Sequence, residues 1–239
     1  MTPISVPWVD AMDAEVETLW AEYLKAEGDH VRDARRRALD RFIDRLVEEP
    51  SSVWQAWARE LASSISDRGA DTPVRFPLFR RVLLPALADG VRRGEPSCAR
   101  WLASFESMLL EARGTTGDLP AEWQTAVGLL TEAVRRDPND DVARRRLVDQ
   151  HASYLRYSLH ELPTGVLYGQ DGATPEQCDE LSEVLAQFKE HVAATAQEQR
   201  FSELISDCEL HFRAYRDYLR SNPRPRGYEE YLRLRGAAT

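Results

Sequence analysis

Histidine and tyrosine side chains gather in one stretch of the second half of the chain. The residues of this stretch that could contact a ligand are His151, Tyr154, Tyr157, His160, Glu161 and Tyr168. Positions 151, 154, 158 and 161 share one helical face by three- and four-residue spacing, and Tyr157 and His160 lie beside that face. A loop rich in proline and glycine follows the helix and carries Tyr168. Tyrosine and histidine combine an apolar body with a polar tip, which suits recognition of a peptide or a small polar ligand. The segment is therefore a candidate binding site, and the alternative is a helix packed on both sides with its polar tips bonded internally.

Acid–base catalysis and metal binding are the other chemistries that the histidines could perform. Cys208 and His211 stand at an i, i+3 spacing that could supply two ligands to a metal. A pair without two further ligands is weak evidence for a zinc site, so we expect a hydrogen-bonded core histidine at 211. We assign no metal, cofactor or catalytic residue. The alternative hypothesis is a small-molecule or metal-dependent enzyme with a helical-bundle core that uses His151, His160 or His211.

The best-known catalytic motifs do not occur in the sequence. It has no phosphate-binding GxxxxGK[ST] loop, no GxGxxG pattern and no GxSxG elbow. A di-metal bundle needs two Glu-x-x-His helices, and the chain offers one, at Glu27 and His30. Arginine runs occur along the chain, but a net charge of −9 argues against a nucleic-acid partner, because such binding depends on a clustered basic field.

Apolar residues recur at helical spacing in nearly every segment. One example is the seam through Phe201, Ile205, Cys208, Phe212, Tyr215 and Leu219. The sequence from Thr174 to Gln177 combines a threonine N-cap with proline in the first turn and glutamine three residues on, which predicts a helix start. No stretch alternates apolar and polar residues long enough for a convincing strand, and residues 166–168 could be one isolated extended piece. The pattern predicts an all-α protein of stacked antiparallel helical hairpins, α-solenoid-like or an irregular bundle, with about nine or ten helices.

A loop at 113–120 is the best candidate division between two helical halves, 1–112 and 120–239, which we expect to pack as one unit. In the second half, residues 126–139 read Ala126-x3-Leu130-x2-Ala133-Val134-x2-Asp137-Pro138-Asn139. This stretch resembles the second helix and closing turn of a tetratricopeptide repeat. The resemblance implies stacked helical hairpins and a scaffold that binds peptides or partner proteins.

Composition restricts the class of protein. The chain has 239 residues, 43% of them hydrophobic and 30% charged, which excludes a disordered chain and a membrane-spanning one. Three cysteines without a CxxC pair and an N-terminus without a basic signal region favour a reduced, cytoplasmic setting. We therefore expect a non-enzymatic helical interaction module, such as an adaptor or a neutralising partner, that binds a protein or peptide and no membrane. The seam from Phe201 to Leu219 is compatible with an internal core and with a homodimer contact.

Overall fold

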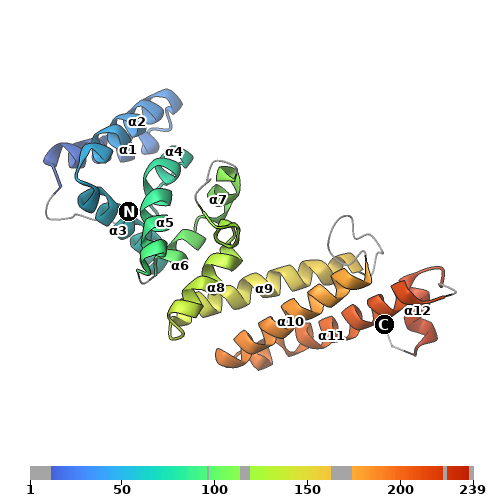
Figure 1. The fold of residues 1–239 in the computed structure, drawn as a ribbon. Helices are drawn as coiled ribbons and strands as arrows, with labels where there is room; N and C mark the ends of the chain where they lie inside the picture. Colours follow the sequence, from blue (N-terminus) through green and yellow to red (C-terminus); the bar gives the residue numbers. More distant parts are fainter. Residues whose placement is uncertain (1–11, 96, 114–118, 163–173, 223–224, 237–239) are drawn as a thin grey trace. The chain divides into compact units, whose positions relative to one another are not determined.

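The protein is all-α, as predicted. The computed structural model describes residues 12–95, 97–113, 119–162, 174–222 and 225–236 (Figure 1). It is 82% helical, and its described residues contain no strand. Neighbouring helices pack in pairs, which is compatible with a helical repeat. The extended piece expected at 166–168 lies outside the described residues. None of the described helices is both long and apolar enough to cross a membrane.

The chain divides into two compact units, an N-terminal unit (Met1–Asn139) and a C-terminal unit (Asp140–Thr239). The boundary follows the turn at Asp137–Asn139, whereas the glycine-rich loop at 113–120 had suggested an earlier division. The N-terminal unit continues past that loop because helix α8 (Ala126–Arg136) packs on helix α6 (Cys98–Ala103). The stretch that resembles a tetratricopeptide repeat forms α8 and the turn after it.

An aromatic cluster holds the first helices of the N-terminal unit together. Trp20 of α1 (Ala14–Gly28) lies 4.8 Å from Phe42 of α2 (Arg32–Glu48) and 5.2 Å from Trp57 of α3 (Ser51–Arg68), measured between ring centroids. All three rings are buried. Tilted and edge-to-face contacts at these distances are favourable beyond the area that they bury, so this cluster stabilises the packing of α1, α2 and α3.

A π-helical turn accommodates a proline in the next helix. Helices α4 (Phe76–Leu78), η1 (Phe79–Leu83) and α5 (Leu84–Arg93) follow one another without a break. Pro85 has no N–H to donate to the carbonyl four residues earlier, and its ring crowds that carbonyl. The N–H of Leu84 instead donates to the carbonyl of Phe79, five residues back. The wider turn lets the helix continue through the proline.

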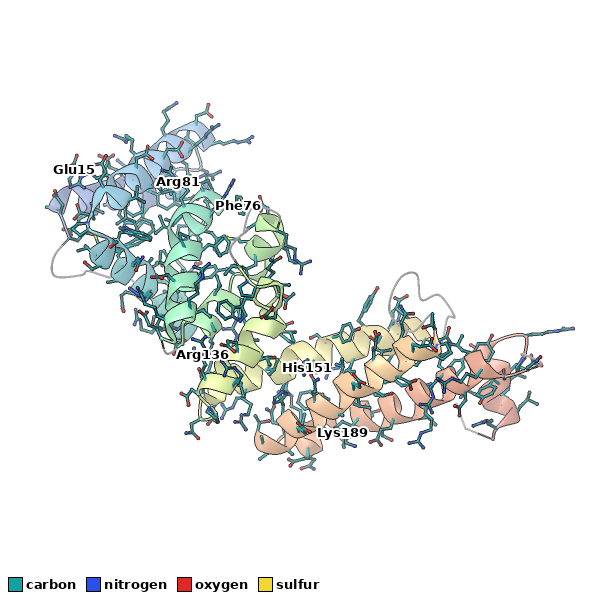
Figure 2. The ribbon with its side chains drawn as sticks, viewed as in Figure 1. Glu15, Phe76, Arg81, Arg136, His151 and Lys189 are labelled. Atoms are coloured by element: carbon teal, nitrogen blue, oxygen red, sulfur yellow. The ribbon has the colours of Figure 1, made fainter. Side chains whose placement is uncertain are left out.

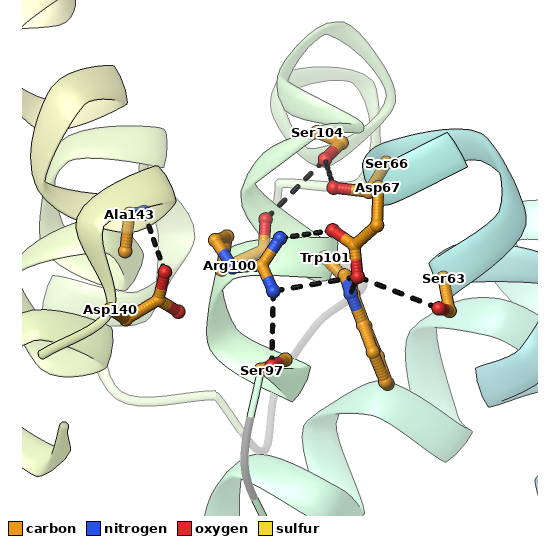
Figure 3. A network of polar contacts seen from close by, with 9 residues as sticks. All are labelled: Ser63, Ser66, Asp67, Ser97, Arg100, Trp101, Ser104, Asp140 and Ala143. Atoms are coloured by element: carbon orange, nitrogen blue, oxygen red, sulfur yellow. Dashed lines mark hydrogen bonds and ion pairs between the residues drawn. The ribbon is translucent and has the colours of Figure 1, made fainter. Parts of the chain in front are cut away.

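A polar network joins α3 to α6 in the same unit (Figure 3). Arg100 pairs with the carboxylate of Asp67, and the indole N–H of Trp101 donates to the same carboxylate at 2.8 Å. The second guanidinium nitrogen of Arg100 also bonds Ser97 Oγ at 3.0 Å. Arg100 is buried, where water cannot solvate its guanidinium group. The carboxylate of Asp67 balances that charge. The remaining short elements of this unit are α7 (Glu106–Ala112) and η2 (Ala121–Gln124).

Long helices packed side by side form the C-terminal unit (Figure 1). They are α9 (Asp141–Glu161), α10 (Pro175–Ala194) and α11 (Glu198–Arg220), and the short α12 (Tyr228–Leu234) packs on α11. The predicted capping box at Thr174 and Gln177 is confirmed. The seam residues Phe201, Cys208 and Phe212 are buried within this unit, so the seam supplies internal core.

Candidate functional site

Helix α9 divides the histidine and tyrosine cluster between its two sides. His151 is only 5% exposed, and Tyr154 packs against the buried core of the C-terminal unit. Tyr157 is 57% exposed and His160 is exposed. The core-facing stripe of α9 runs through Leu155 and Ser158. Tyr157 stands two positions after Leu155 and His160 two positions after Ser158, which is about 200° around the helix in each case. The side chains of Tyr157 and His160 therefore lie on the solvent side.

The two remaining residues of the predicted cluster are Glu161 and Tyr168. Glu161 is half-buried at the end of α9. Tyr168 lies outside the described residues. The described part of the cluster is thus a buried histidine, a half-buried tyrosine and glutamate, and two exposed side chains.

His151 forms a pair with His191 of α10. Their ring centroids are 5.9 Å apart, and Nδ1 of His151 is buried with no hydrogen-bond partner among the described residues. Burial, reinforced by His191, lowers the pKa of His151 to about 4. Burial and the nearby charge of Arg144 also lower the pKa of His191. Both imidazoles are consequently neutral at pH 7.

Metal binding receives no support from this pair. A guanidinium charge beside His191 opposes a bound cation. Within the described ranges, no group of three or more histidine, cysteine, aspartate or glutamate side chains could hold a metal ion.

His211 is hydrogen-bonded, as the sequence predicted, but it is half-buried and does not lie in the core. Its Nδ1 lies 2.9 Å from the hydroxyl of Tyr228, and the two rings meet edge to face at 6.0 Å. The hydroxyl also donates to the carbonyl of His211 at 3.3 Å. These contacts attach α12 to α11, so His211 has a structural partner.

A groove between α10 and α11 is the feature that sequence reasoning missed. It has a volume of about 350 Å³, at the lower end of the range for ligand sites. The residues that α10 contributes are Ser182, Leu185, Ala186 and Lys189. Their spacing of three and four places them on one side of the helix over about 10 Å. Ser182 and Ala186 are small, which leaves room above the buried Leu185.

Helix α11 supplies both the floor and most of the charge of this groove. Cys208 and Phe212 are buried at the bottom, and Glu209, Arg213 and Arg216 stand at the rim. Burial raises the pKa of the Cys208 thiol to about 12. The thiol therefore stays protonated and acts as an apolar surface, because the thiolate is the reactive form.

Ion pairs cross the groove between the two antiparallel helices. Lys189 Nζ lies 2.6 Å from Glu209 Oε1, and Arg216 Nη1 lies 2.8 Å from Asp179 Oδ1. Arg213 is exposed and forms no ion pair with any side chain that the structure describes. Among the basic side chains that line the described groove, Arg213 is therefore the one without an ion pair to a described side chain.

The groove and the histidine pair lie on different sides of α10. Lys189 and His191 are two residues apart, or about 200° of helix rotation. Figure 2 labels His151 on α9 and Lys189 on α10. A ligand in the groove would therefore contact α10 and α11 and leave the histidine pair covered.

Comparison with protein-family models, with curated proteins and with solved structures finds no match for this chain.

Proposed function

We propose that this protein is a helical interaction module that binds a segment of a partner protein in the groove between α10 and α11. The observation that carries the proposal is an apolar floor, formed by Leu185, Cys208 and Phe212, under a charged rim. Such a floor favours burial of apolar side chains, and the rim supplies orientation and specificity. This makes binding a polypeptide segment the function that the groove supports best.

Catalysis has less support from the same residues. The thiol of Cys208 has a raised pKa, and the carboxylate of Glu209 is engaged by Lys189. The alternative enzyme would use His151, His160 or His211. His151 is buried beside His191, His211 is bonded to Tyr228, and His160 stands on the solvent side of α9. General acid–base work needs a group that reaches its substrate with a suitable pKa, which favours binding over catalysis here.

The cellular role stays within the same proposal. All three cysteines are buried thiols, which fits the reducing cytoplasm. An adaptor and a neutralising partner would each use such a groove to bind another protein.

A photo-crosslinking amino acid placed in the full-length protein tests the proposal. It replaces Ala186, which is exposed at the groove, or Tyr157, which is exposed on α9. After irradiation in the host cells, the Ala186 position should give one defined polypeptide adduct and the Tyr157 position should not.

A groove-filling variant controls for chance encounters. Ser182→Trp places a large ring over the groove from an exposed position, so it should abolish the adduct at position 186. An adduct that survives this change, or one formed only from position 157, would contradict the placement of the site.

A further inference from the structure

We infer that the occupant of this groove is an amphipathic helix of another protein that pairs an acidic side chain with Arg213. The inference rests on the proposed function and specifies the chemistry of the partner. It is carried by the length of the groove, by its apolar floor and by the distribution of charge along its rim.

The dimensions of the groove favour a helix. The α10 wall runs from Ser182 to Lys189, which is two helical turns or about 10 Å. A partner helix with apolar residues at i, i+4 and i+7 would place one anchor per turn along that length. The small side chains of Ser182 and Ala186 let another backbone approach, as ridges of one helix fit the grooves of a neighbour. The partner would then lie against α10 and α11 as an added helix of the C-terminal unit.

The charge on the rim selects an acidic partner. Lys189 and Glu209 neutralise each other, and Arg216 is held by Asp179 and Asp217. Arg213 is exposed beside an apolar floor and forms no ion pair with a described side chain. A carboxylate brought there would be partly desolvated and could accept bidentate hydrogen bonds from the guanidinium, whereas a lysine would be repelled. Arg213 is therefore the specificity-determining residue of the groove.

Two matched pools of synthetic helical peptides test the inference. Both pools carry apolar anchors at i, i+4 and i+7, varied among Leu, Ile, Met and Phe. One pool has glutamate and the other lysine at the flanking positions. The full-length protein is immobilised, the pools are mixed in equal amounts, and the retained peptides are counted by mass spectrometry. Retention should favour the glutamate pool at least about tenfold, and Ser182→Trp should reduce retention to background.

Reversing the charge of Arg213 shows whether this residue contacts the peptide directly or whether the overall charge of the protein sets the preference. Arg213→Glu should invert the preference, so that the lysine pool is retained more than the glutamate pool. The matched control is Arg145→Glu, since Arg145 is exposed on α9, has no ion pair among the described side chains and does not line the groove. This variant should leave the ratio of the pools unchanged. An equal change in both variants would show a general charge effect and overturn the role of Arg213.

The remaining outcomes distinguish failure of the inference from failure of the proposed function. Equal retention of the two pools, abolished by Ser182→Trp, would overturn the acidic partner and keep the groove as a binding site. No retention together with an adduct at position 186 would overturn the helical occupant alone. No retention and no adduct would overturn both. A dimer of this chain that Ser182→Trp disrupts would make a second copy the occupant and overturn a partner of different sequence.

Discussion

Acid should destabilise the C-terminal unit through His151. The side chain is buried on α9 beside His191, with an unpaired Nδ1. Folding must keep it neutral, because protonation would place a charge where water cannot solvate it. Replacing His151 by leucine removes the proton site and keeps an apolar side chain of similar size, so the variant should lose most of the acid sensitivity that this residue causes.

The magnitude follows from the shift in the pKa of His151 from 6.5 to about 4. Because the folded pKa is the lower one, the unfolded chain binds more protons between these values. Stability from this residue is therefore complete above pH 6.5 and falls as the pH drops toward 4. The linkage relation gives a loss of about 2 kcal/mol between pH 7 and pH 5, and about 3 kcal/mol once both states are protonated. Burial and the nearby charge of Arg144 also lower the pKa of His191, so this residue adds to the slope in the same direction.

The distribution of tryptophan makes the assay specific to one unit. All six tryptophans precede residue 140, so their fluorescence follows only the N-terminal unit, whereas circular dichroism at 222 nm follows both. Urea unfolding of the full-length protein at several pH values, read by both signals, resolves the C-terminal transition. The control variant is His160→Leu, which removes an exposed histidine from the same helix.

Three results separate the explanations. The wild type and the His160→Leu variant should lose stability in the C-terminal unit in parallel as the pH falls from 7 to 5. The His151→Leu variant should lose about 2 kcal/mol less over that range. An identical pH dependence in all three proteins would refute the claim that a neutral, buried imidazole is required in the fold.

Three further perturbations address packing, ion pairing and thiol chemistry. Gly128→Ala should destabilise the N-terminal unit by more than about 2 kcal/mol, because the added Cβ would collide with the backbone carbonyl oxygen of Glu122. The control is Gly28→Ala, whose Cβ meets nothing within 4 Å and which should be neutral or stabilising. Tryptophan fluorescence during urea unfolding measures the stability of both variants. Glu27→Gln removes the charge of a buried carboxylate that accepts two hydrogen bonds from the half-exposed Arg75, and it should cost about 1.5 kcal/mol in the same assay. A change below about 0.5 kcal/mol would contradict the contribution of that pairing. The three buried thiols, whose pKa values burial raises to about 11 or 12, should react with a disulfide reagent only after unfolding, and rapid labelling of the native protein would contradict their burial.

The helices were predictable because their signals are local. The capping box at Thr174 needs only four consecutive residues, and the apolar seam through Phe201 and Phe212 needs only regular spacing. The unit boundary was harder to predict, since the packing of α8 on α6 depends on contacts between segments distant in the sequence. A glycine-rich stretch of sequence does not by itself separate two cores.

The groove could not be predicted from either helix alone. Ser182 and Ala186 are small residues four apart on α10, which is a weak signal for a close approach, and nothing in that pattern identifies α11 as the opposite wall. The importance of Arg213 depends on the ion pair between Lys189 and Glu209, which exists only because the helices lie antiparallel. The α9 cluster was visible in the sequence because histidine and tyrosine are conspicuous, but their distribution between core and solvent follows from the rotation of that helix.

Hydrogen exchange measured by mass spectrometry tests the central claim most directly. Exchange of the full-length protein would be compared with and without the retained glutamate peptides at saturating concentration. We predict slower exchange in peptides that cover 182–189 of α10 and 208–216 of α11, and the same change should be lost in Ser182→Trp. Protection confined to α9 or to the N-terminal unit, or no protection under saturation, would contradict the assignment of the groove as the binding site.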